Sequence, residues 1–250
     1  MNTALVAFLY QLADDEWIAG HRQSEWLGLA PDLEEDIAFS SIAQDEVGHA
    51  NYFYGLLANE LQTTADHEAF ERPAAERRNA YMLELPNGDW AYTIVRSYFY
   101  NMFEQVRLQT LLESKIVALR QGADKMLREE RYHTLHMQTW FERLLIVGGV
   151  AKAKTVRAIC ELWPYLDDLF SLGEDESDII AQGIFTKTPA ETYAIWEGIV
   201  RPLFIRVGYE WPGNPLQGQS LGRSGHHSKH LDNILSTMVE VSGTDVHATW

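Results

Sequence analysis

The sequence is short of cysteine and of basic residues. Its one cysteine, Cys160, cannot form an intramolecular disulfide, which excludes a disulfide-stapled secreted domain, and we expect it to be a small core residue. Only 20 Lys and Arg stand against 36 Asp and Glu, a formal net charge of -16, which disfavours nucleic acid or an anionic membrane as the partner. No basic start leads into an apolar leader segment. We therefore expect a cytoplasmic protein.

Long hydrophobic runs are also lacking. The longest, such as LLIVGGVA at residues 144–151, are far shorter than the roughly 20 residues that a membrane-spanning helix needs. No run of alternating residues predicts a strand either. What the chain does have is 46% hydrophobic and 12% aromatic residues over 250 positions, enough for a substantial core. We expect a soluble protein with one domain over residues 1–250.

Apolar residues recur at every third or fourth position, which is the spacing of amphipathic helices. Asp32 with Glu35 is a plausible helix N-cap and capping box. The predicted helices cover residues 3–27, 32–61, 89–116, a stretch that ends at 146 after a break near Gly122, then 152–170, 177–185, 189–207 and 230–241. Residues 62–88 form a connection. The prediction is an all-α bundle whose core is the two hairpins 3–61 and 89–146, with further helices in residues 150–250.

Two motifs place a carboxylate and an imidazole on one helix face. They are Glu46-x-x-His49 and Glu130-x-x-His133, and a spacing of three aligns the two side chains of each motif. One such motif means little, but both lie on apolar stripes. The stripes contain Phe39, Ile42, Ala43, Phe53 and Leu57 in one helix, and Ala123, Met126, Leu127, Met137, Phe141 and Leu144 in the other. A buried carboxylate costs several kcal/mol unless it is protonated or meets a cation, so these groups require a partner such as a metal ion.

The hairpins supply two more carboxylates, because residues equally far from a turn lie level in antiparallel helices. The first turn centres near residue 30, which places Glu16 level with Glu46. The second turn lies near residue 117, which places Glu104 level with Glu130.

The full set combines one Glu from each of two helices with Glu-x-x-His from each of the other two. The predicted metal ligands are Glu16, Glu46, His49, Glu104, Glu130 and His133. This is the ligand pattern of ferritin-like di-iron bundles, and hard carboxylate donors with one imidazole per ion suit two iron ions. The alternative interpretation is that these residues lie on solvated helix faces by chance.

An acid precedes each Glu-x-x-His motif. Asp45 and Glu129 point about 100° around their helices from the ligands, where they can bind the outer ring nitrogen of the histidine across the bundle. We predict the pairs Asp45 with His133 and Glu129 with His49. The alternative is that both are surface acids.

Four stretches resemble the phenylacetic acid catabolism family, and within it the C-type subunits of the bacterial phenylacetyl-CoA monooxygenase (ring-1,2-epoxidase). They are LADDEWIAGHRQSEWLGLAPDLEEDIAFSSIAQDEVGHANYF, PNGDWAYTIVRSYF, EERYHTLH and HLDNILSTM, followed by a terminal Trp250. The resemblance implies a ferritin-like fold, epoxidation of the ring of phenylacetyl-CoA or a related aromatic CoA thioester, and an oligomeric complex. It also implies an A-type oxygenase subunit and a reductase as partners, the latter carrying FAD, a [2Fe-2S] cluster and the NADPH site. The sequence departs from the C-type pattern, which has lost most metal ligands and is structural, because all six ligand positions match here.

Three functions therefore stay open. The first is a di-iron subunit of a multicomponent oxygenase, the second a metal-free structural partner of a catalytic A-type subunit, and the third a ferritin-like iron oxidase or peroxidase. The segment with His226, His227, Lys229 and His230 is interpreted as a polar helix start with incidental histidines, a second metal site or CoA-phosphate contact being the alternative.

Overall fold

The computed structural model describes residues 1–219 and 221–244, which form helices and connecting loops without a strand. Trp250 lies outside the described residues. The α-helices are α1 (Thr3–Ser24), α2 (Leu33–Leu61), α3 (Tyr81–Glu84), α4 (Trp90–Leu111), α5 (Val117–Ile146), α6 (Gly149–Leu162), α7 (Leu166–Phe170), α8 (Glu176–Ala181), α9 (Pro189–Arg206) and α10 (Lys229–Met238). Short π and 3-10 turns interrupt the loops, among them His67–Glu71, Ala74–Glu76, Trp163–Tyr165 and Gly222–Ser224. The all-helical prediction is confirmed.

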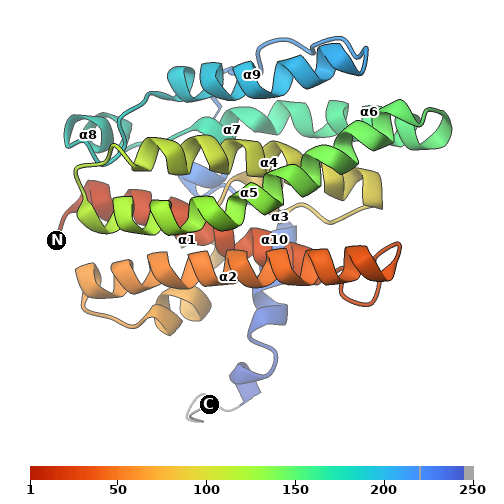
Figure 1. The fold of residues 1–250 in the computed structure, drawn as a ribbon. Coiled ribbons are helices and arrows are strands. Elements are labelled where there is room, and N and C mark those ends of the chain that lie inside the picture. The colour runs from red at the N-terminus through yellow and green to blue at the C-terminus, as the bar shows by residue number, and fades with distance from the viewer. Residues whose placement is uncertain (220, 245–250) are drawn as a thin grey trace.

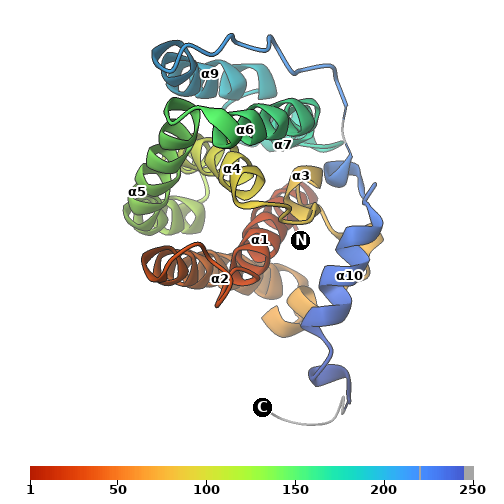
Figure 2. The same ribbon diagram turned by 90° about the vertical axis from the view of Figure 1, so that its right-hand side faces the viewer.

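Two antiparallel hairpins form the bundle. Helix α1 packs along α2, and α4 packs along α5 (Figure 1). Seen along the helix axes, these four helices surround a common interior, α6 and α9 stack outside α4, and α10 lies at the side of α1 and α3 (Figure 2). This is the predicted core of two hairpins with additional C-terminal helices.

Helix starts follow local capping chemistry. The Asp32 side chain accepts a hydrogen bond from the Glu35 backbone N–H at 2.9 Å, which satisfies one of the free donors of α2. The predicted reciprocal bond of the capping box is not formed. The Glu35 carboxylate instead pairs with His136 of α5 at 2.9 Å, so a local cap became a contact between the hairpins.

The predicted helix break near Gly122 is wrong, because α5 runs through that residue from Val117 to Ile146. The hairpin turns earlier, at residues 112–116. Gly122 is needed for packing: a Cβ there would lie 2.5 Å from the Tyr52 ring of α2. The glycine allows a close approach between α2 and α5 and does not end the helix.

The predicted helix 152–170 is divided in the structure. Helix α6 ends at Leu162, a 3-10 turn follows with Pro164 inside it, and α7 is a separate short helix. Proline has no N–H to donate and clashes with the preceding turn, which explains the break. The expectation that Cys160 is a core residue is also wrong, since it is exposed, with its Sγ 3.9 Å from the Tyr209 hydroxyl.

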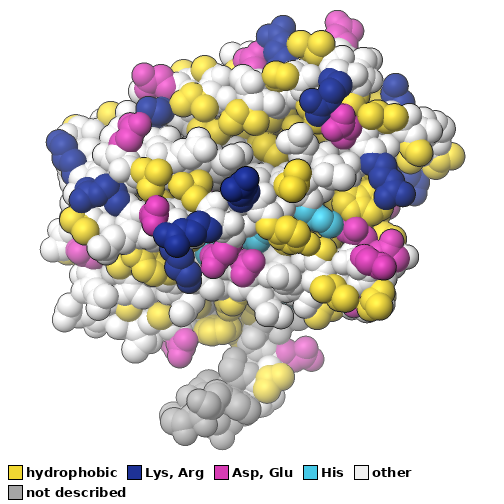
Figure 3. Space-filling model, viewed as in Figure 1, with side chains coloured by type: hydrophobic (Ala, Val, Ile, Leu, Met, Phe, Trp, Pro, Cys, Tyr) yellow, Lys and Arg dark blue, Asp and Glu magenta, His cyan; other side chains and the backbone are white. Residues whose placement is uncertain are grey.

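Charged side chains of both signs are scattered over the face formed by α2 and α5 (Figure 3). No helix in the described part of the chain is long and apolar enough to cross a bilayer.

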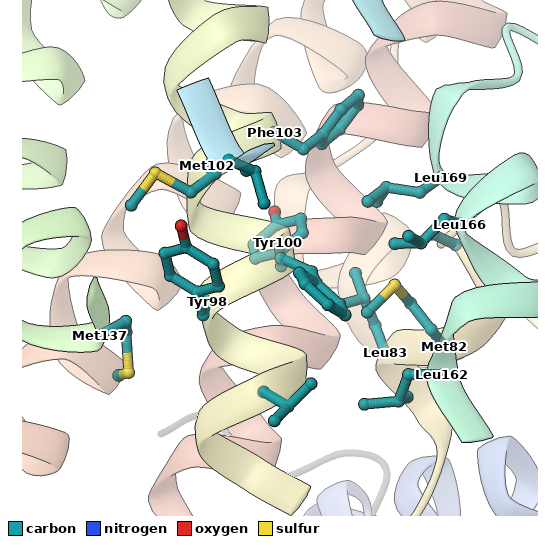
Figure 4. Close-up of a cluster of buried hydrophobic side chains, with 14 of the residues drawn as sticks. Met82, Leu83, Tyr98, Tyr100, Met102, Phe103, Met137, Leu162, Leu166 and Leu169 are labelled. Atoms are coloured by element: carbon teal, nitrogen blue, oxygen red, sulfur yellow. The ribbon is translucent and has the colours of Figure 1, made fainter. Parts of the chain in front are cut away.

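The largest hydrophobic cluster surrounds α4. Tyr98 lies toward Met137 of α5, whereas Tyr100 and Phe103 lie on the side of Leu166 and Leu169 (Figure 4). Full burial of such side chains stabilises the fold by about 1.5–3 kcal/mol each. Helix α4 is thus held on both sides, which fixes the carboxylate that it carries.

Candidate metal centre

Each helix of the bundle contributes predicted ligands to the interior. Glu16 comes from α1, Glu104 from α4, and the two Glu-x-x-His motifs from α2 and α5. All six side chains are buried, none being more than 2% exposed. The four carboxylates and two histidines predicted from spacing therefore lie inside the bundle.

The structure gathers two groups of potential ligand atoms. One group is Glu16, Glu46 and His49, and the other is Glu46, Glu130 and His133, with the ligand atoms of each group within 4.8 Å of one another. Glu46 belongs to both: its Oε2 lies 3.5 Å from Nδ1 of His49, and its Oε1 lies 3.6 Å from Nδ1 of His133. Glu46 thus lies between the two groups, which is the place of a carboxylate that bridges two ions.

Both histidines turn Nδ1 inward and Nε2 toward an acid of the opposite hairpin. Nε2 of His49 lies 2.8 Å from Glu129, and Nε2 of His133 lies 3.1 Å from Asp45. The two acids are about one-third exposed, with side-chain exposures of 33% and 35%. These are the contacts expected from the sequence, and such acids orient metal-binding imidazoles and raise their basicity. Their role toward a metal stays a prediction.

The electrostatics of the centre are dominated by burial and by the close carboxylates. Burial alone would lower the pKa of His49, but contacts with Glu16 and Glu46 outweigh it and raise the pKa to about 12. For His133, burial is likewise outweighed, chiefly by Glu130, and the pKa is raised to about 11. Burial and the neighbouring Glu46 raise the pKa of Glu16 to about 7. Without a metal, protons on the histidines carry the positive charge that these carboxylates require.

Many polar atoms of the centre have no hydrogen-bond partner among the described residues. They are Glu16 Oε2, both carboxylate oxygens of Glu46 and of Glu104, His49 Nδ1 and Glu130 Oε2. Buried polar atoms are normally satisfied, so a cluster of unpaired acceptors facing one another calls for a bound cation. Carboxylate oxygens with one imidazole per group are suitable ligands for iron. The residues present therefore fit two metal ions.

Glu104 differs from the other five residues. It is fully buried but belongs to neither ligand group in the described structure. Its carboxylate forms an ion pair with Arg107, one turn further along α4. Arg107 also lies 3.3 Å from Glu16 and 2.5 Å from Asp15. Whether Glu104 binds a metal stays a prediction.

The sequence interpretation missed the arginines around the centre. Arg107, Arg223 and their shared partner Asp15 are all buried, and Arg223 comes from the C-terminal turn Gly222–Ser224. For Arg107 a signal existed, because it lies three residues after Glu104 and so on the same helix face. For Arg223 no local signal existed, because its partner is 208 positions away.

The histidine-rich segment lies outside the two ligand groups. His227 contacts Glu84 at 2.7 Å through Nδ1 and the backbone oxygen of Arg77 at 3.0 Å through Nε2. The Ser228 side chain accepts from the His230 N–H and caps α10. The interpretation as a polar helix start agrees with these contacts, and His227 attaches that start to the connection between the hairpins.

An apolar pocket of about 430 Å³ opens on the α1–α2 hairpin. Its walls include Trp17, Gly20, Ala43, Val47 and Phe70. Trp17 and Val47 directly follow ligand positions and therefore point about 100° away from them. The pocket is on a neighbouring face of the hairpin and not in the interior of the bundle.

Comparison with known proteins places the chain. The family model described as phenylacetic acid catabolic protein matches residues 1–250. The chain belongs to this family. Among its relatives, the C-type subunit of 1,2-phenylacetyl-CoA epoxidase from Escherichia coli (strain K12) is 33% identical over 239 residues, which cover 94% of each chain. The family resemblance inferred from the sequence motifs is confirmed.

The fold of this phenylacetic acid catabolic protein is found in a solved structure as well. Protein 19 with aldehyde deformylating oxidase activity from Synechococcus aligns with a TM-score of 0.53 at 19% identity, covering 83% of this chain and 88% of that chain. At this identity the likeness concerns the fold alone. It confirms the ferritin-like helical bundle predicted from the spacing of the ligands.

Proposed function

We propose that this chain is a di-iron carboxylate subunit of a multicomponent oxygenase in aerobic phenylacetate degradation, which epoxidises the ring of phenylacetyl-CoA. The observation that carries the proposal is the pair of ligand groups joined by Glu46, whose two oxygens have no other partner among the described residues. The name of the E. coli relative, a phenylacetyl-CoA epoxidase component, supports the substrate class.

The residues of the chain would divide the work among them. Glu16, Glu46, His49, Glu130 and His133, with Glu104, hold two iron ions, which when bound supply the activation of oxygen. Asp45 and Glu129 fix the ring orientation of the two histidines and hold the proton on Nε2.

Apolar side chains one turn from the ligands close the centre to water. Ile42 and Ala50 on α2 and Met126 on α5 are at most 2% exposed. A water-free surrounding strengthens the electrostatic interactions inside it and protects reactive species from side reactions.

Electrons must come from another chain, because a single cysteine cannot hold a [2Fe-2S] cluster, which needs four protein ligands. We therefore assign NADPH, FAD and the cluster to a separate reductase, and we place the chain in a cytoplasmic complex with an A-type oxygenase subunit. The relative's name, which makes it one lettered component of an epoxidase, supports the assembly with other subunits.

One observation favours a second function, that of a structural subunit beside a catalytic A-type partner. Arg107 already supplies a positive charge to Glu104 and Glu16, so part of the buried negative charge is balanced without a metal. A folded, metal-free protein is compatible with this pairing.

Metal analysis after anaerobic reconstitution with ferrous iron tests the proposal. We expect about two irons per chain in the wild type, as in di-iron bundles, and loss of iron in Glu46→Ala, because Glu46 joins both ligand groups. Glu34→Ala, an exposed position of α2, is the matched control and should keep its iron. Equal, low iron in the wild type and in Glu46→Ala would contradict the six-ligand centre.

The complex with the A-type subunit and reductase separates the two functions. If this chain is catalytic, a complex assembled with Glu46→Ala should turn over phenylacetyl-CoA at least about 100-fold more slowly, the loss expected when an essential catalytic group is removed. Undiminished turnover in a fully assembled complex would establish the structural function.

A further inference from the structure

Arg107 occupies the side of the centre nearest to α4. It is 2% exposed and its guanidinium contacts three carboxylates, those of Glu104, Glu16 and Asp15. Its pKa is raised well above the ordinary value, because Glu104 and the other nearby acids outweigh burial. Arg107 is therefore a permanent cation beside the predicted ligands.

The position of Arg107 makes the two ligand groups unequal. In the first group, Glu16 keeps Oε2 free 3.6 Å from His49 Nδ1, while only its Oε1 meets Arg107. The second group has Glu46, Glu130 and His133 but no carboxylate from α4, since Glu104 is paired with Arg107. The first group is thus complete with a terminal carboxylate, and the second is one carboxylate short.

A second ion pair holds Arg107 in place. Asp15 Oδ2 accepts from Arg107 at 2.5 Å and from Arg223 at 2.7 Å, and Arg223 also binds Oδ1 at 2.8 Å. Asp15 is therefore anchored by Arg223 and offers Arg107 a partner that does not depend on Glu104. Arg107 can release Glu104 without becoming an unpaired buried charge.

Resting on the proposed di-metal centre, we propose that Arg107 controls the order in which the metals bind. The first ion enters at Glu16, Glu46 and His49. The second ion enters at Glu46, Glu130 and His133, and binds fully only when Glu104 exchanges the Arg107 guanidinium for the metal. Arg107 acts here as a positioning residue, because it holds a ligand and does not itself bind the ion.

Anaerobic titration of the metal-free chain with Co²⁺, followed by calorimetry and by the visible spectrum of bound cobalt, tests this order. The wild type should bind two ions in two steps that differ at least 10-fold in affinity. In Arg107→Met the second step should tighten at least 10-fold toward the first, because Glu104 is no longer held. Arg107→Lys, which keeps a cation near Glu104, is the matched control and should retain two separate steps.

Glu104→Gln provides an independent arm, which covers the case that Arg107→Met does not fold. This variant should keep the first step within about 3-fold and lose the second. Two equal steps in the wild type, an unchanged affinity ratio in a folded Arg107→Met, or equal loss of both steps in Glu104→Gln would overturn the inference. Failure of the wild type and all variants to bind cobalt would instead overturn the metal centre itself, and this inference with it.

Discussion

Three consecutive acids of α1 have opposite surroundings. Asp14 accepts from the Tyr54 hydroxyl at 2.7 Å and from the Arg78 N–H at 2.8 Å, and also pairs with Arg72. Asp15 likewise has partners on both oxygens, supplied by the Ala80 N–H, Arg107 and Arg223. Glu16, the next residue, leaves Oε2 without a hydrogen-bond partner among the described residues.

The difference separates acids that hold the fold from acids that are free to bind a ligand. Burial alone does not distinguish them, since all three are 0% exposed. Hydrogen-bond satisfaction does distinguish them, because a buried carboxylate with a purely structural role normally has a partner on each oxygen. The unpaired acceptors of Glu16 and Glu46 are therefore the sign of a binding site.

The largest expected effect comes from breaking a satisfied acid. Asp15→Ala would leave Arg107 and Arg223 facing each other without their shared partner, and removal of one member of a buried ion pair costs about 3–5 kcal/mol. We expect a loss of this size in the free energy of unfolding, measured with urea on the metal-free chain. Glu46→Ala is the contrasting variant: it removes unpaired oxygens, so it should not destabilise the metal-free protein. Equal destabilisation by both changes would remove the distinction between the two kinds of acid.

A smaller effect is expected from neutralising Asp14. Burial would raise the pKa of Asp14, but the guanidiniums of Arg72 and Arg77 outweigh burial and hold it below the ordinary value of 3.8. Because the folded pKa is depressed, this group stabilises the protein fully above pH 3.8 and loses that contribution as the pH falls through the folded pKa. Asp14→Asn should cost about 2 kcal/mol at pH 7 and flatten the decline in stability on acidification, measured by urea unfolding at a series of pH values. Asp66→Asn, at an exposed position, should leave the acid profile unchanged.

The smallest effect on the fold, and a selective one on the centre, is expected at Asp45. This partly exposed acid contacts Nε2 of His133, so Asp45→Asn should alter the stability of the metal-free chain by no more than about 1 kcal/mol. Metal affinity should fall about 10-fold or more, the typical cost of losing an acid behind a ligating histidine. Anaerobic cobalt titration measures this, with Asp124→Asn on the exposed face of α5 as control. Unchanged affinity would show that Asp45 is only a surface acid.

The fold followed from hydrophobic periodicity because most of the long helices bury a stripe of side chains, and that pattern is local. The errors arose where tertiary contacts decided the outcome. Gly122 continues α5 because the Tyr52 ring occupies the space of a side chain, which no local pattern reveals. Pro164, in contrast, was a local signal for ending α6 that the predicted helix overlooked. The prediction of one domain over residues 1–250 stays a prediction.

The candidate ligands followed from the sequence for a different reason. Glu46, His49, Glu130 and His133 share helix faces with apolar residues, and turn geometry then located Glu16 and Glu104. The ion pair that withdraws Glu104 from the second group could not be counted in this way, because it depends on the direction of the Arg107 side chain. Its anchor, Asp15 with Arg223, joins segments that no periodicity relates.

The contact between Asp15 and Arg223 has a consequence for how the molecule is made. The two residues are 208 positions apart, so an acid of the first helix obtains this partner only near the end of synthesis. Domains begin to fold from the N-terminus as they are translated, and contacts between distant segments form late. Until then the α1 hairpin carries incompletely neutralised acids, and the bundle reaches its final stability only after the segment that contains Arg223 has docked.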